Sequence, residues 1–167
     1  TDQENRIKPI MAELKMDTTQ WKPRTVISSI SSAKNKLVDP ETFASTTSGY
    51  YNHNVAQIYK KYQTLLKANN ALDFDDLLIK TVELFKTHPD VLEMYQEKFR
   101  FNLIDEYQDT KYSQYTITRL LANRYRNICV TGDPDQSIYG WRGADIRNIM
   151  DFEKDYPDAK VVLLEQN

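Results

Sequence analysis

Apolar positions in the first part of the chain recur at the spacing of helix faces. Ile7, Ile10 and Met11 share one such face, which stops near Asp17. Pro23 occupies a favoured first position for the next helix. The pattern predicts further helices over residues 23–37, in a short turn after residue 40, over 50–67, over 74–85 with Asp73 as N-cap, and over 90–99.

The pattern changes after residue 100, where short apolar runs replace the helical period. These runs, at residues 101–104, 127–131 and 160–164, are predicted strands, with helices at 111–124 and 144–155 between them. Strands that alternate with helices imply parallel βαβ units. The predicted fold class is therefore α/β, with a helical module over residues 1–70 and part of a parallel sheet over residues 71–167.

Composition is that of a folded chain. The 167 residues are 40% hydrophobic and 28% charged, with 11 Tyr, 6 Phe and 2 Trp, which argues against disorder. No run of about 18 apolar residues occurs, so we expect no membrane contact. Cys129 lies in an apolar run and is expected in the core. A lone cysteine forms no internal disulfide, which favours a cytoplasmic location.

Charge is unevenly distributed along the chain. The net charge is −2, and the first 70 residues carry +4 while the remainder carries −6. A basic part beside an acidic part is compatible with a nucleic-acid surface in one place and a carboxylate site in another. An ordinary mosaic surface explains the charges equally well.

The segment LIDEYQDT, residues 103–110, places the adjacent acids Asp105 and Glu106 at the end of a predicted strand. Ligands in open α/β sheets bind beyond such strand ends. One carboxylate can hold Mg²⁺ while the next orients or deprotonates an attacking water. The alternative is that the acids decorate a helix N-terminus and are stabilised by the helix dipole.

A second polar segment, TGDPDQSIYGWRGAD at residues 131–145, follows the next predicted strand. Gln136 both donates and accepts hydrogen bonds, so it is a candidate sensor of a γ-phosphate or its attacking water. Tyr139, Trp141 and Arg142 combine aromatic rings with a guanidinium, a combination suited to base stacking. The alternative is that Trp141 anchors the loop in the core.

Together these segments resemble a known family. Residues 105–110 resemble motif II, and residues 132–145 motif III, of the UvrD/PcrA/Rep helicases of superfamily 1. Residues 72–78, LDFDDLL, resemble another stretch of that family, and residues 163–167, LLEQN, the opening of its motif IV. The order and spacing of these segments agree over nearly the whole chain.

The resemblance implies an ATP-driven 3′–5′ DNA helicase or translocase of repair or replication, built from RecA-like P-loop NTPase domains with helical insertions. Residues 1–70 would be the insertion subdomain, and residues 71–167 the later part of the first RecA-like domain. Asp105 would hold Mg²⁺, Glu106 would be the catalytic base and Gln136 would contact the γ-phosphate of ATP.

The same resemblance implies contacts with DNA. Tyr139 and Trp141 would stack on single-stranded bases, with Arg142 supporting their loop. The insertion would face duplex DNA, and its basic residues are weak candidates for that contact because solvated surface is their ordinary role. These residues are Lys22, Arg24, Lys34 and Lys36.

Several parts of the family pattern are missing from this sequence. It holds no G-x-x-x-x-G-K-[S/T] phosphate loop and stops before motifs V and VI. We therefore expect a piece of a longer protein, inactive alone, whose incomplete sheet swaps, dimerises or exposes apolar surface. Two alternatives remain: a non-hydrolytic module that binds DNA or protein, and part of an AddA/RecB-type helicase–nuclease subunit.

Overall fold

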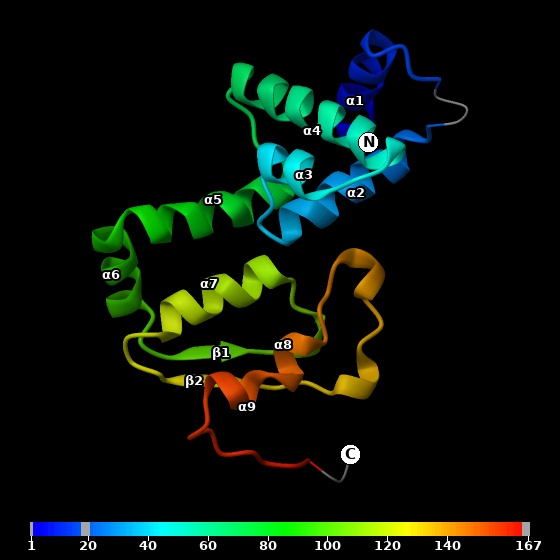
Figure 1. The fold of residues 1–167 in the computed structure, drawn as a ribbon. Coiled ribbons are helices and arrows are strands. Elements are labelled where there is room, and N and C mark those ends of the chain that lie inside the picture. Colours follow the sequence, from blue (N-terminus) through cyan, green and yellow to red (C-terminus); the bar gives the residue numbers. More distant parts are fainter. Residues whose placement is uncertain (1, 18–20, 165–167) are drawn as a thin grey trace.

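A computed structural model describes residues 2–17 and 21–164 of the chain. Its order is helical first and mixed later, as the hydrophobic pattern predicts (Figure 1). The elements are α1 (Asp2–Glu13), α2 (Pro23–Asn35), α3 (Pro40–Thr46), α4 (Tyr50–Ala68), α5 (Phe74–Thr87), α6 (Pro89–Lys98), β1 (Asn102–Ile104), α7 (Tyr112–Ala122), β2 (Ile128–Val130), α8 (Arg147–Met150) and α9 (Phe152–Asp155), with 3-10 turns at Tyr107–Asp109, Pro134–Gln136 and Gly140–Arg142.

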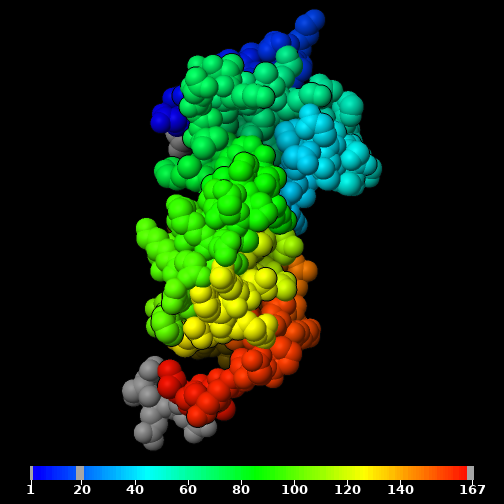
Figure 2. All heavy atoms as spheres, turned by 90° about the vertical axis from the view of Figure 1, so that its left-hand side faces the viewer, coloured from blue at the N-terminus to red at the C-terminus, as the bar shows by residue number. Residues whose placement is uncertain are grey.

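The helices of the first part enclose a core of their own. Packing among α1, α2 and α4 buries the apolar faces that the sequence predicts for them, and α3 lies against α4. The fully enclosed members of this core include Met11, Val55 and Ile58. Figure 2 shows the helices as one end of an elongated molecule, with α5 and α6 in the middle and the strand-containing part at the other end.

Predicted helix starts are confirmed by their caps. Pro23 is the first residue of α2, and the Asp39 side chain accepts a 2.8 Å hydrogen bond from the Thr42 amide at the start of α3. Asp73 caps α5 in a capping box, accepting from the Asp76 amide at 2.8 Å. These bonds satisfy amides that have no partner inside the helix.

The two strands β1 and β2 pair in parallel, in the register Asn102↔Ile128 to Ile104↔Val130, with α7 as their crossover. This arrangement confirms the predicted parallel βαβ unit. Helix α7 lies between α5 and the strands (Figure 1). A hydrogen bond of 2.5 Å from the Tyr115 hydroxyl of α7 to Asp155 ties α9 to this unit. The fold is thus α/β, a helical chain with a small parallel sheet.

Two predicted elements at the C-terminal end are wrong. Residues 161–164 form no strand, and Leu164 is 89% exposed, because no neighbouring strand pairs with them among the described residues. The helix predicted over residues 144–155 is instead two short helices, α8 and α9, interrupted at Asp151. Glu165, Gln166 and Asn167 of the motif IV resemblance lie outside the described residues.

The middle residue of each strand faces an open side of the sheet. Leu103 is 79% exposed, and its partner Cys129 is exposed too, so the expectation that Cys129 fills the core is wrong. The physical reason is that a sheet of two strands is too narrow to enclose both of its faces. Of the three outcomes expected for an incomplete sheet, exposed apolar surface is the one seen here, and swapping and dimerisation stay predictions. No helix in residues 2–17 and 21–164 has the length and apolarity needed to cross a bilayer.

Candidate functional site

Asp105 and Glu106 follow the last residue of β1, so the strand carries both carboxylates to the carboxyl edge of the sheet. The Asp105 carboxylate accepts hydrogen bonds from the Thr131 hydroxyl and, at 3.0 Å, from the Glu106 amide. The hydroxyl of Thr131, and next the Glu106 amide, lower the pKa of Asp105 below its usual value. Asp105 is therefore an exposed, charged carboxylate with a fixed orientation.

Glu106 has a left-handed backbone, with φ of 51°, a conformation that costs a non-glycine residue roughly 1–2 kcal/mol. Its carbonyl accepts from the Asp109 amide at 2.9 Å, which closes the 3-10 turn after it. Its carboxylate accepts a 2.6 Å hydrogen bond from the side-chain amide of Gln108. Glu106 directly precedes this 3-10 turn, but its side chain makes no capping hydrogen bond to it.

The donor set at Asp105 suits Mg²⁺. This ion prefers hard oxygen ligands, keeps several waters and is held by one or two carboxylates together with substrate phosphates. An exposed carboxylate of lowered pKa beside the Thr131 hydroxyl meets that requirement. No cluster of three or more acidic, His or Cys ligands occurs in the part of the chain that the structure describes. Asp105 would thus hold the ion in partnership with other oxygens.

The loop after β2 comes very close to the carboxylate segment. A Cβ at Gly132 would lie 2.3 Å from the Gln108 side-chain oxygen, so a side chain at this position would force Gln108 or the loop to shift. The Asp133 amide donates to that same oxygen at 3.1 Å. Gln136, the candidate γ-phosphate contact, donates from its side-chain amide to the Asp133 carboxylate at 2.8 Å. Both predicted polar segments are therefore joined through one buried glutamine, Gln108.

Tyr139, Trp141 and Arg142 lie together in the next part of this loop. The Arg142 guanidinium lies 5.0 Å from the Tyr139 ring centre and 4.7 Å from the Trp141 ring centre. The Trp141 side chain is 74% exposed, so the alternative in which it anchors the loop in the core is wrong. An aromatic surface supported by a guanidinium stands open to solvent.

The aromatic loop is fastened to the segment that carries the carboxylates. Lys111 and Ala144 form an antiparallel bridge, and the Asp145 amide donates to the Thr110 carbonyl at 3.0 Å. Asn148, which is buried, donates to the same carbonyl at 2.9 Å. The loop that carries Tyr139, Trp141 and Arg142 is therefore attached at both of its ends to the segment that carries the carboxylates.

Lys34 is not a surface residue, which contradicts both its role as a DNA candidate and the expectation of a solvated side chain. Its side chain is fully buried, and its ammonium lies 2.7 Å from carboxylate oxygens of both Asp73 and Asp76. The pairing partners lie about forty positions further along the chain. Lys34 therefore joins α2 to the start of α5.

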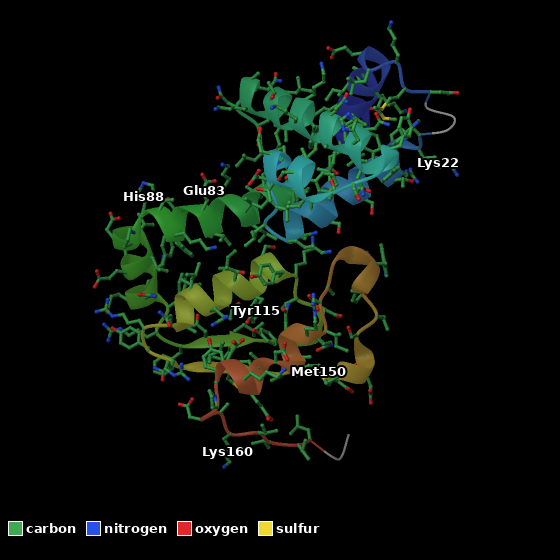
Figure 3. The ribbon with its side chains drawn as sticks, viewed as in Figure 1. Lys22, Glu83, His88, Tyr115, Met150 and Lys160 are labelled. Carbon is green, nitrogen blue, oxygen red and sulfur yellow. The ribbon has the colours of Figure 1, made fainter. Side chains whose placement is uncertain are left out.

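The other basic residues of positions 1–70 that are candidates for contact with duplex DNA are exposed. Lys22 lies just before α2, at the right-hand edge of the molecule in Figure 3. Arg24 is exposed and pairs with Glu4 at 2.6 Å, and Lys36 is exposed at the end of α2. Their exposure leaves the predicted contact with duplex DNA as a prediction.

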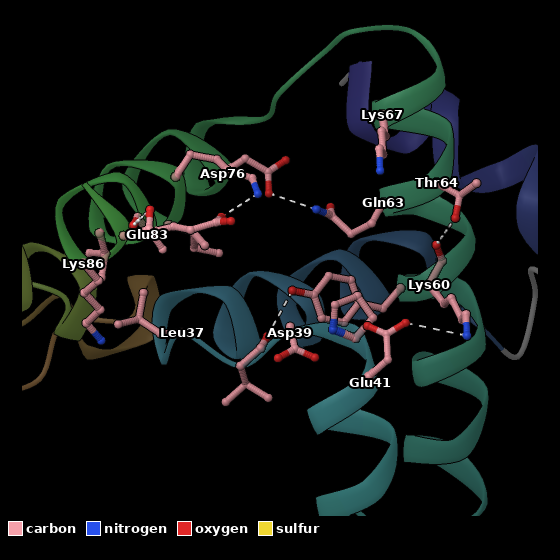
Figure 4. Close-up of a pocket in the computed structure, with 17 residues that line it drawn as sticks. Leu37, Asp39, Glu41, Lys60, Gln63, Thr64, Lys67, Asp76, Glu83 and Lys86 are labelled. Carbon is pink, nitrogen blue, oxygen red and sulfur yellow. Dashed lines mark hydrogen bonds and ion pairs between the residues drawn. The ribbon is translucent and has the colours of Figure 1, made fainter.

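A cleft of about 680 Å³ lies between the helical part and α5 (Figure 4). All of its lining residues fall between positions 37 and 87, so none of them belongs to the strands or to the loops that follow. Polar groups in it have local partners: Lys60 pairs with Glu41 at 3.6 Å, and the Gln63 amide donates to the Asp76 carboxylate at 3.1 Å. The cleft is separate from the carboxylate site.

A parallel β–α–β unit with polar groups gathered beyond its strand ends is typical of the α/β class of nucleotide-binding domains. The sequence model of the UvrD/REP helicase N-terminal domain matches residues 1–157. The chain belongs to this family of helicase domains.

Individual relatives agree with that assignment. The chain is 52% identical over 166 residues to the ATP-dependent DNA helicase PcrA of Bacillus subtilis, a match of 99% of this chain and 22% of the relative. It is 50% identical over 167 residues to the PcrA proteins of Staphylococcus epidermidis and Staphylococcus aureus, covering 23% of each. The chain thus spans less than a quarter of the length of these relatives.

Proposed function

We propose that this chain supplies part of the motor of an ATP-dependent DNA helicase or translocase that moves 3′–5′ on DNA in repair or replication. One observation carries the proposal: the carboxylates after β1 and the exposed aromatic loop after β2 are tied together by hydrogen bonds. Such a connection is what a protein needs to link nucleotide hydrolysis to its grip on a strand. The family and the names of the relatives support the same function.

Each candidate residue has a role in this proposal. Asp105 holds Mg²⁺, which neutralises charge on the phosphates of ATP when bound. Glu106 is the catalytic base that receives a proton from the attacking water, and Gln136 contacts the γ-phosphate. Tyr139 and Trp141 stack on bases of single-stranded DNA.

In this proposal the role of Arg142 is to support the rings of Tyr139 and Trp141, and direct contact with bases is left to those rings. Its guanidinium lies within about 5 Å of both ring centres, a distance at which a cation stabilises an aromatic face. Base stacking on such rings is worth roughly 1–3 kcal/mol per base and tolerates any sequence. A motor that moves along arbitrary DNA needs that tolerance.

The helical part, residues 1–70, is proposed as the insertion subdomain that faces duplex DNA. Residues 71–167 are proposed as the later part of a RecA-like domain. Because these residues include no phosphate loop, we expect the chain alone to hydrolyse no appreciable ATP. Activity belongs to the full-length protein that carries these residues.

Unwinding assays on DNA with tails of opposite polarity test the proposal. The full-length protein should unwind a duplex with a 3′ single-stranded tail in the presence of ATP and Mg²⁺, and leave a 5′-tailed duplex intact. Binding without any unwinding or translocation would favour the alternative of a non-hydrolytic interaction module. Nuclease activity in the same protein would favour the AddA/RecB-type alternative.

A further inference from the structure

Gln108 has an unusual position in this site. Its side chain is 1% exposed, although it lies directly between the exposed Glu106 and the loop after β2. Its amide nitrogen donates to the Glu106 carboxylate at 2.6 Å, and its amide oxygen accepts from the Asp133 backbone at 3.1 Å. Both halves of the amide are used, and each bond joins a different polar segment.

The chemistry of these partners fixes the orientation of the amide. A carboxylate only accepts and a backbone N–H only donates, so the nitrogen of Gln108 must face Glu106 and its oxygen must face Asp133. Gly132 lets the loop approach this closely, because a Cβ there would lie 2.3 Å from the Gln108 oxygen. The loop and the glutamine therefore hold each other in place.

We infer that Gln108 is a positioning residue, which holds Glu106 in one side-chain conformation and joins it to the loop that bears Gln136. This inference rests on the proposed function, since it concerns how the proposed base is held. The bonds run from Glu106 to Gln108, on to Asp133, and from the Asp133 carboxylate to Gln136 at 2.8 Å. A shift of the loop after β2 therefore reaches the Glu106 carboxylate through a single buried side chain.

The need for such a device follows from the exposure of Glu106. A long side chain at the surface samples several conformations, and a displacement of about 1 Å in a catalytic group costs on the order of 100-fold in rate. A buried donor with no freedom of its own removes this sampling. Because Gln108 itself is 1% exposed, it presents almost no surface to a bound ligand, so its effect should fall on turnover rather than on nucleotide affinity.

The substitution Gln108→Glu tests this role in the full-length protein. The new carboxylate still accepts from the Asp133 amide but donates nothing to Glu106, and its charge repels the Glu106 carboxylate. We expect kcat for ATP hydrolysis on single-stranded DNA to fall on the order of 100-fold, with KM for ATP within about threefold. Gln108→Met, which removes the donor without adding charge, repeats the test if Gln108→Glu does not fold.

Gln96→Glu is the matched control. Gln96 is another buried glutamine, and its amide donates to the Leu120 carbonyl at 2.8 Å, between α6 and α7 and outside the site. The control should leave kcat within about twofold, since it loses a comparable hydrogen bond without touching Glu106. Equal losses of kcat in both variants would mean that Gln108 is merely structural.

A double-mutant cycle with Glu106→Gln completes the test. If Gln108 acts through Glu106, adding Gln108→Glu to Glu106→Gln should lower the single-turnover rate no further. Multiplying losses, or an unchanged kcat in Gln108→Glu beside a strong loss in Glu106→Gln, would overturn the inference alone. No DNA-stimulated hydrolysis in the unsubstituted protein would instead overturn the proposed function.

Discussion

Replacing Lys34 by methionine removes the cation from a buried group of carboxylates and leaves a side chain of similar length. Lys34 is fully buried, and the side chains of Asp73 and Asp76 are 6% and 2% exposed. The Tyr62 hydroxyl also donates to Asp73 at 3.1 Å, and Gln63 to Asp76 at 3.1 Å. These neutral donors remain in the variant, but the ammonium that pairs with both carboxylates is lost.

The expected loss of stability is large. Removing one partner of a buried ion pair destabilises a protein by about 3–5 kcal/mol, because a charge is left buried without compensation. Two carboxylates share the Lys34 ammonium at 2.7 Å, which favours the upper part of that range. Urea unfolding of the 167-residue chain, followed by circular dichroism, measures the change in free energy of unfolding.

The loss should depend on pH with a defined sign. Burial favours protonation of Asp73, but the hydrogen bond and charge of Lys34 outweigh it and hold the pKa of Asp73 below its usual value. Asp73 thus stabilises the fold above the pKa of the unfolded chain, about 3.9, and this stabilisation is lost as pH falls through the folded pKa. Without Lys34, the Asp76 amide and the Tyr62 hydroxyl still favour the charged form of Asp73, but no ammonium helps them to oppose burial, which favours the protonated form. The difference between the two proteins should be largest near neutral pH and shrink towards pH 4.

Lys61→Met is the matched control, since Lys61 pairs with Glu13 at 2.5 Å on the surface, with 40% of the lysine side chain exposed. Exposed pairs contribute about 0–1 kcal/mol, so this variant should be nearly as stable as the unsubstituted chain. A loss below about 1 kcal/mol in Lys34→Met, or one that does not change with pH, would refute the account of Lys34 as the compensating cation.

Two further predictions concern the loop after β2. Gly132→Ala should destabilise the chain by about 1–3 kcal/mol, because the added Cβ meets Gln108, whereas Gly140→Ala should have little effect because nothing lies within 4 Å of its Cβ. Thermal unfolding of both variants checks this, and equal melting temperatures would contradict it. Trp141→Ala in the full-length protein should weaken single-stranded DNA binding by roughly 1–3 kcal/mol in fluorescence titrations. Phe74→Ala, a control at another exposed aromatic, should not weaken it.

Local signals in the sequence predicted most helices and both strands of the sheet. Pro23 and the N-cap Asp73 act within a few residues of themselves, so the helix starts that they mark could be read directly. The apolar runs before Asp105 and Thr131 are short and bounded by polar residues, which fixed the β1 and β2 positions. Because β1 and β2 are parallel, the two polar segments that follow them lie at the same edge of the sheet.

The missed features depend on residues far apart in the sequence. Lys34 looked like an ordinary surface lysine because its partners, Asp73 and Asp76, lie about forty positions away. The role of Gln108 is not among the predictions, because it arises from the loop that begins at Gly132. Its spacing of two residues after Glu106 was the available signal.

The strand predicted at residues 160–164 does not form, so the local pattern was a poor guide at this place. An apolar run becomes a strand only when another strand is there to bond with it, and none pairs with residues 161–164 in the described part of the chain. Cys129 is exposed for a related reason, because burial of a strand depends on what covers the sheet.

ATP hydrolysis by the full-length protein, with and without single-stranded DNA, tests the proposed motor most directly when measured beside Glu106→Gln. We expect strong stimulation by DNA, and loss of that turnover in Glu106→Gln with ATP binding retained, because the amide cannot accept the proton of the attacking water. A folded protein without DNA-stimulated turnover, or a Glu106→Gln variant that hydrolyses ATP at the full rate, would contradict it.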